Sequence, residues 1–328
     1  MVPFLLLRRA GMRRWLMIFI SLVALSASAK PRGAPPKVLP FAAHGAFVGD
    51  EYRFNRDHVF TGFLTRFAAD FISIPTGMPW WSPGDWAIMS GVLASTVALS
   101  VVTSIDHQPA SVDTKFQNFL TYELLGGPDH FKVWGPVGDP AIWTSVGVAL
   151  IATLLYGFIA HNDDAVEYVS LIFEAAIVAQ LYHQIIKLIT GRSGPQRPEM
   201  YGQYYGPGEV AANGGTWLWP QGTPSGHMAT MYAMLSVIMY MVDHPAVWVG
   251  LHAVALIFGA SLIGDNYHWL SDVTFGAALG YAVGRWVVLH RSTHYRYGVD
   301  AQSGPRLELL PLLVPSSGIG GLAIVGTF

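Results

Sequence analysis

The segment Thr223-Pro-Ser-Gly-His-Met228 opens an apolar run that contains no charged residue through Val242. Thr223 suits the N-cap of a helix, and Pro224 suits its first helical position. The backbone amides that follow belong to Ser225, Gly226 and His227, and they would have no acceptor within the helix. Together with the helix dipole, these amides would form a binding site for an anion. Ser225 would add a hydroxyl donor, and His227 would be placed to give a proton to a leaving oxygen. The alternative is an ordinary capped helix with a histidine in its first turn.

A second segment, Ser261-Leu-Ile-Gly-Asp-Asn-Tyr-His-Trp-Leu-Ser-Asp272, leads into the last apolar run. His268 precedes Asp272 by four residues, so the carboxylate can hydrogen-bond one imidazole nitrogen. That contact fixes the tautomer and leaves the other nitrogen free to attack. The alternative is that Asp272 only caps a helix, and the two roles can coexist.

A third segment, Lys187-Leu-Ile-Thr-Gly-Arg-Ser-Gly-Pro-Gln-Arg-Pro198, places three cations at the end of another apolar run. The guanidinium groups of Arg192 and Arg197 can each donate two parallel hydrogen bonds to phosphate oxygens, and Lys187 can act as a point charge. Flanking charge of a membrane span is the alternative, but the other loops between apolar runs contain few cations. His183, one turn before Lys187, either faces the same site or is a satisfied histidine of the bundle.

The composition points to a membrane protein. Charged residues make up 12% of the 328 residues, against about 25% in soluble domains. The net charge of −2 gives no indication of nucleic-acid binding. The chain has no cysteine, which excludes disulfides and thiolate metal sites.

The hydrophobic pattern predicts an all-α protein with six transmembrane helices. The candidate spans lie near 85–105, 140–160, 165–190, 224–242, 245–264 and 270–290. We therefore divide the chain into four parts: a signal peptide (1–29), an N-terminal segment with an interfacial helix (30–84), a membrane bundle (85–290) and a tail with a small β-hairpin (291–328). A further amphipathic helix is expected around Val112 to Leu125.

Together the three segments resemble the type 2 phosphatidic acid phosphatase superfamily, which includes lipid phosphatases and vanadate haloperoxidases. The sequence Pro224-Ser-Gly-His227 matches the second motif of that superfamily in full. Ser261, His268 and Asp272 match the third motif with the right spacing. The resemblance covers roughly residues 85–290 and includes the order of the motifs along the spans.

The resemblance implies a role for each matching residue. His268 would be the nucleophile that forms a phosphohistidine, Asp272 would orient it, and His227 would be the general acid. The phosphate would be held by Lys187, Ser225, Gly226 and the arginine of the first motif, for which Arg192 and Arg197 are the candidates.

Two departures from the superfamily pattern concern arginines. Nine residues separate Lys187 from Arg197-Pro198, three more than in the pattern, and alignment on Arg192 places Gly194 where the arginine belongs. Leu262 stands where the third motif has an arginine. We expect both Arg192 and Arg197 to reach the phosphate, one of them replacing the missing guanidinium.

The expected function is metal-independent hydrolysis of a phosphomonoester or pyrophosphate on a lipid, without a cofactor. The expected partners are a phosphorylated lipid and a membrane, not nucleic acid. The expected location is a multi-pass position in the bacterial cell envelope with the site on the outer face. Two alternatives remain: a lipid phosphotransferase, and a degenerate member that binds lipid without catalysis.

Overall fold

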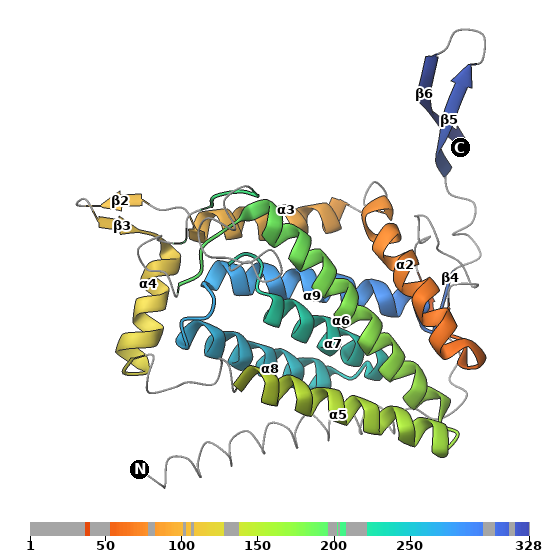
Figure 1. Cartoon of the computed structure of the whole chain (residues 1–328), viewed down its shortest axis with the longest axis horizontal. Coiled ribbons are helices and arrows are strands. Elements are labelled where there is room, and N and C mark those ends of the chain that lie inside the picture. Colours follow the sequence, from red (N-terminus) through yellow and green to blue (C-terminus); the bar gives the residue numbers. More distant parts are fainter. Residues whose placement is uncertain are drawn as a thin grey trace.

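A computed structural model describes residues 37–39, 53–77, 83–100, 103–105, 108–127, 138–195, 202, 204–207, 222–297, 306–314 and 319–327. The expected signal peptide and Arg197 lie outside these residues. Most of the described chain is helical (Figure 1). The helices are α2 (Val59–Gly77), α3 (Pro83–Ser100), α4 (Val112–Asn118), α5 (Gly138–Ile159), α6 (Asp163–Thr190), α7 (Gly226–Val242), α8 (Pro245–Gly264) and α9 (Leu270–Arg291). A 3-10 turn, η2 (Arg56–His58), precedes α2, and a π-helical turn, η4 (Phe119–Leu124), continues α4.

The described strands form three separate pairs. β1 (Lys37–Leu39) runs parallel to β4 (Tyr295–Tyr297), with Lys37 opposite Tyr295. β2 (Thr103–Ile105) and β3 (Gln108–Ala110) are antiparallel, with Thr103 opposite Ala110. β5 (Arg306–Val314) and β6 (Ile319–Thr327) are also antiparallel, with Arg306 opposite Thr327.

Helices occupy all six ranges in which the sequence predicts membrane spans. Among the described residues, three helical segments are long and apolar enough to cross a bilayer: Pro140–Ile159, Asp163–Thr190 and Pro245–Gly264. Two shorter apolar helices, Trp86–Ser100 and Gly226–Val242, fall below that length. The number of helices that cross a membrane therefore stays a prediction.

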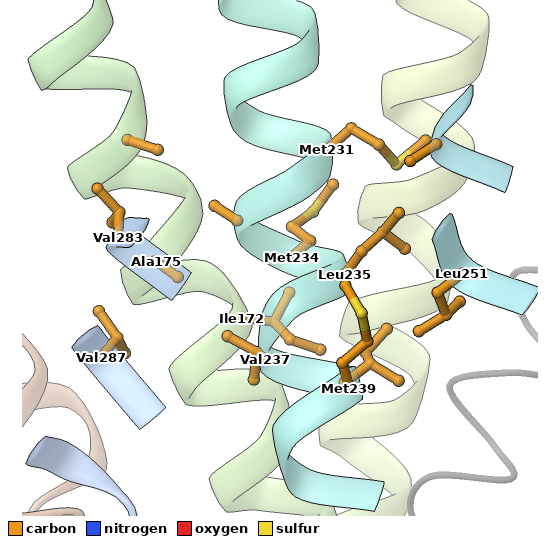
Figure 2. Packing of buried hydrophobic residues seen from close by; sticks show 14 of the residues in the cluster. Ile172, Ala175, Met231, Met234, Leu235, Val237, Met239, Leu251, Val283 and Val287 are labelled. Carbon is orange, nitrogen blue, oxygen red and sulfur yellow. The ribbon is translucent and has the colours of Figure 1, made fainter. Parts of the chain in front are cut away.

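The hydrophobic core surrounds α7, which packs against α6, α8 and α9. Figure 2 shows side chains of α7 meeting those of the neighbouring helices. Five methionines and other apolar residues of α7 belong to this core, together with apolar residues of α6 and valines of α9. The labelled members of this core are Ile172, Ala175, Met231, Met234, Leu235, Val237, Met239, Leu251, Val283 and Val287.

Three glycines at helical spacing allow α9 to approach α7 closely. A Cβ atom at Gly276, Gly280 or Gly284 would lie 2.5, 2.2 or 2.4 Å from a carbonyl oxygen of α7 or of the residue that caps it. Small residues at such intervals let the backbones of membrane helices meet. This contact fixes the start of α7 beside the start of α9, where two of the sequence motifs lie.

The polar face of α2 is directed toward the bundle. Arg66 and Asp70 are buried, whereas Phe60 and Leu64 are 72% and 66% exposed. Arg66 donates to Glu174 of α6 at 2.9 Å, and Arg291 of α9 donates to Asp70 at 2.8 Å. A helix on a membrane surface would present these charges to water, so the burial of this face differs from what the sequence pattern led us to expect.

Candidate active site

The start of α7 differs in one detail from the sequence prediction. Ser225, not Thr223, is the N-cap residue, and its hydroxyl accepts a hydrogen bond from the amide of Met228 at 3.3 Å. The expectation that Thr223 caps the helix was therefore wrong. The physical reason is a tertiary contact, since the amide of Ser225 donates to the carbonyl of Asp272 at 2.9 Å and holds the chain extended there. Gly226 and His227 then occupy the first turn of α7.

His227 lies among aromatic rings at the mouth of the bundle. Its ring centroid is 5.7 Å from that of His268 and 5.2 Å from that of Tyr267. Trp143 of α5 lies 6.1 Å away on another side. The structure thus brings together the two histidines singled out by the sequence, although 40 residues separate them along the chain.

His268 is buried and faces Asp272. Its Nδ1 atom lies 3.8 Å from Oδ2 of Asp272, and within the described part of the chain Nδ1 has no hydrogen-bond partner. Burial lowers the pKa of His268 from 6.5 to about 4, because the effect of desolvation outweighs that of the neighbouring carboxylate. His268 is therefore neutral near pH 7, the state in which an imidazole nitrogen can attack.

Asp272 is fixed by groups other than His268. Its Oδ1 atom accepts from Nη1 of Arg192 at 2.5 Å and from the hydroxyl of Thr223. Its Oδ2 atom accepts from the amide of Trp269 at 3.1 Å, as in a helix-capping contact. Asp272 therefore caps α9 and lies beside the imidazole of His268 without a hydrogen bond to it, so its role in orienting His268 stays a prediction.

Arg192 is surrounded by hydrogen-bond acceptors of the protein itself. Its side chain is buried and donates to five oxygen atoms: Nε donates to one, Nη1 to three and Nη2 to one. The acceptors belong to Gly202, Thr223, Ser271, Asp272 and Asp113. These acceptors all belong to the protein itself, so the expected contact of Arg192 with phosphate stays a prediction.

The charges around Arg192 keep it protonated. Burial alone would lower its pKa, but Asp272, Tyr204 and Asp113 raise it overall. Its guanidinium also lies 5.1 Å from the ring centroid of Tyr204 and 5.8 Å from that of Trp269. Two carboxylates and two aromatic rings thus surround the Arg192 guanidinium, which stays positively charged.

Asp113 is a member of this group that sequence reasoning missed. It lies in the first turn of α4 and is fully buried. It accepts from Nη2 of Arg192 at 2.8 Å and from the amide of Ser271 at 2.9 Å. The only signal in the sequence is an acidic residue after the good N-cap residue Ser111, which is an ordinary feature of helix starts.

Lys187 and His183 lie on the side of α6 that faces the site. Lys187 is 8% exposed, and its ammonium makes no hydrogen bond or ion pair with another described residue. The ring of His183 packs against the backbone of Gly226, where an added Cβ would lie 2.5 Å from Nε2 of His183. The sequence left open whether His183 faces the site or belongs to the interior of the bundle. Its contact with Gly226 favours a position at the edge of the site.

Leu262 is fully buried in the hydrophobic core. Its position therefore supplies no cation to the site. Among the described residues, no group of three or more histidine, cysteine, aspartate or glutamate side chains could hold a metal ion.

Comparison with known proteins bears on this site. The sequence profile of the PAP2 superfamily matches residues 168–296, which include Lys187 and both histidines. The resemblance seen in the motifs is therefore confirmed over this segment.

One curated relative is the lipid A 1-phosphatase of Porphyromonas gingivalis, with 34% identity over 104 residues. The aligned segment covers 28% of this chain and 23% of that protein, so the chain spans about a quarter of the relative's length. No solved structure matches the chain significantly.

Proposed function

Because residues 168–296 match the PAP2 superfamily, we propose that this protein is a phosphatase acting on a lipid phosphomonoester or pyrophosphate through a phosphohistidine intermediate, without a metal ion. The observation that carries this proposal is the paired imidazoles of His227 and His268, whose ring centroids are 5.7 Å apart. His227 lies in the first turn of α7, and the buried Lys187 is near enough to His268 to lower its pKa.

His268 is the proposed nucleophile. Since Nδ1 faces Asp272, Nε2 is the nitrogen directed to substrate, and it attacks phosphorus. A P–N bond forms while the bond from phosphorus to the leaving oxygen breaks. His227 donates a proton to that oxygen, then as a base takes a proton from the water that attacks the phosphohistidine. This second step releases inorganic phosphate and restores His268.

The phosphate oxygens need positive groups, because the transferring phosphoryl group carries charge on its three outer oxygens. We assign this role to Lys187, to the amide of Gly226 and to Ser225 at the start of α7. Arg197 is a further candidate, since it follows Lys187 in the chain.

A lipid substrate is supported by two observations. Large apolar side chains are exposed on α5 and α8, among them Leu155 and Leu256 at 55% and 72%. The aligned relative is named as a phosphatase of lipid A. We therefore place lipid A beside phosphatidate and polyprenyl pyrophosphate as candidate substrates, and we propose a six-span bundle with the site on the outer face of the cell envelope.

Phosphate release by the detergent-purified protein, measured with each of these three lipids, tests the proposal. We expect release from at least one lipid, with His227→Ala slower by about 10²–10⁴-fold, the usual contribution of a general acid. Addition of an alcohol acceptor separates hydrolysis from phosphotransfer, because a transferase would form acceptor phosphate in place of inorganic phosphate. Lipid binding without turnover in the wild type would favour the non-catalytic alternative.

A further inference from the structure

Asp113 joins the candidate site from a part of the chain outside the matched segment 168–296. It is carried by α4, which lies at the end of the bundle where α9 begins (Figure 1). The helix buries Asp113 and Gln117 and exposes Val112 and Phe116. Its polar side therefore points toward the site, and the buried carboxylate is the charged group on that side.

Asp113 makes two kinds of contact. Its Oδ1 atom accepts from the amide of Ser271 at 2.9 Å, which fixes the first turn of α9. Its Oδ2 atom accepts from Nη2 of Arg192 at 2.8 Å and from the hydroxyl of Ser271. Both carboxylate oxygens are thus engaged, and a buried carboxylate held in this way restricts the guanidinium to one orientation.

The guanidinium of Arg192 also contacts Asp272, the carboxylate that lies beside the proposed nucleophile His268. Its other terminal nitrogen, Nη1, donates to Oδ1 of Asp272 at 2.5 Å, and Oδ2 of Asp272 faces Nδ1 of His268 at 3.8 Å. The four side chains therefore form a continuous row from α4 to the imidazole. We propose that Asp113 is a positioning residue for the reaction, acting through Arg192 to hold Asp272 against His268.

This proposal rests on the proposed function and adds an electrostatic consequence. Arg192 is shared by two carboxylates, so the three groups together carry one negative charge. This net negative charge stabilises the positive charge that develops on the imidazole of His268 when it is phosphorylated. Among the residues that the structure describes, the other titratable or charged groups that interact electrostatically with His268 come from α6 and α7: Lys187, His183 and His227. All of these are cationic when protonated, so within the described chain the negative charge comes from Asp272, which acts on His268 directly, and from Asp113, which we propose acts at longer range.

The test is the Asp113→Asn variant, which keeps the size of the side chain and an oxygen for the amide of Ser271. We expect kcat to fall about 10- to 100-fold, as is typical when a supporting hydrogen-bond partner is lost, with KM little changed. We also expect the acidic limb of the kcat/KM profile to move to lower pH, because removal of a negative charge makes His268 harder to protonate. The double variant with Arg192→Gln should be no slower than Arg192→Gln alone, since Asp113 acts through Arg192.

Glu174→Gln is the matched control. It breaks the buried pair of Glu174 with Arg66, which has a length of 2.9 Å, and it lies on α6 about 20 Å along the helix from Lys187. We expect lower thermal stability in detergent but an unchanged kcat and pH profile. If Asp113→Asn does not fold, Asp113→Glu replaces it: this variant keeps the charge but displaces the carboxylate, so kcat should fall without movement of the acidic limb.

Wild-type kcat in the folded Asp113 variant would overturn the proposal. So would a loss of kcat that only follows the loss of thermal stability, with the acidic limb unmoved in Asp113→Asn. Failure of the proposed function would give different results. Either the wild type would release no phosphate, or the His268→Ala variant would still release phosphate. Turnover that needs His268 but is indifferent to Asp113 rejects the positioning role alone.

Discussion

The ring of His183 and the backbone of Gly226 are in direct contact, so closely that a Cβ atom on Gly226 would lie 2.5 Å from Nε2 of the imidazole. Gly226 begins α7, where the proposed anion site lies, and His183 stands one turn before Lys187 on α6. The contact sets the distance between the two helices that are proposed to hold the phosphate.

This contact makes Gly226 intolerant of a side chain. We expect Gly226→Ala to lower kcat/KM strongly, because His183 is buried and has little room to move away. In the double variant Gly226→Ala/His183→Ala the imidazole is gone, so part of the activity should return. Kinetics of the single and double variants check this, and a Gly226→Ala variant with full activity would show that the helices separate easily.

The close approach of α7 and α9 gives a second prediction. At Gly280 a Cβ atom would lie 2.2 Å from the carbonyl oxygen of Ala229, so Gly280→Ala must force the helices apart. We expect a loss of about 1–3 kcal/mol in stability, the usual cost of overpacking, and a loss of activity.

Gly250→Ala on α8 is the matched control, since nothing lies within 4 Å of a Cβ atom there. Thermal unfolding in detergent should show Gly250→Ala at or above wild-type stability, because alanine favours a helix more than glycine does. Equal behaviour of the two variants would refute the close packing.

The buried state of His268 predicts the pH dependence. Its pKa lies at about 4 instead of 6.5, so the nucleophile stays neutral well below pH 6.5 and the acidic limb of kcat/KM should appear near pH 4. The unfolded chain takes up this proton near pH 6.5, so stability should also fall as the pH decreases from 6.5 toward 4. A limb near 6.5 in the pH–rate profile would contradict the burial of this ring.

The proposed reaction draws its positive charge from protein side chains, chiefly Lys187. We therefore expect EDTA to leave phosphate release unchanged and vanadate, a phosphate mimic, to inhibit it. Activity that disappears in EDTA and returns with a divalent ion would require a metal in the mechanism.

Sequence reasoning located the helices and the two histidines because their signals are local. The apolar runs have the length and composition of helices in lipid, and His268 and Asp272 lie four residues apart where α9 begins. Each of the six expected ranges contains a helix, and the histidine motifs lie at adjacent helix starts.

The sequence could not show which partner each polar group would choose. Arg192 binds Asp113, about 80 residues earlier in the chain, and Thr223 donates to Asp272 instead of capping α7. Such pairings depend on how helices meet in space, which no local pattern records. The same holds for α2, whose charges pair with α6 and α9 although its pattern is that of a surface helix.

The most direct test of the account is a search for the covalent intermediate. Wild-type protein is mixed with a ³²P-labelled lipid phosphate and quenched in the millisecond range, and the protein-bound label is then assayed for acid lability. We predict an acid-labile, alkali-stable phosphoenzyme that is absent in His268→Ala and accumulates in His227→Ala when the leaving group needs no proton. Labelled, active His268→Ala protein, or wild-type turnover with no protein-bound phosphate at any time, would contradict the assignment of His268 as the nucleophile.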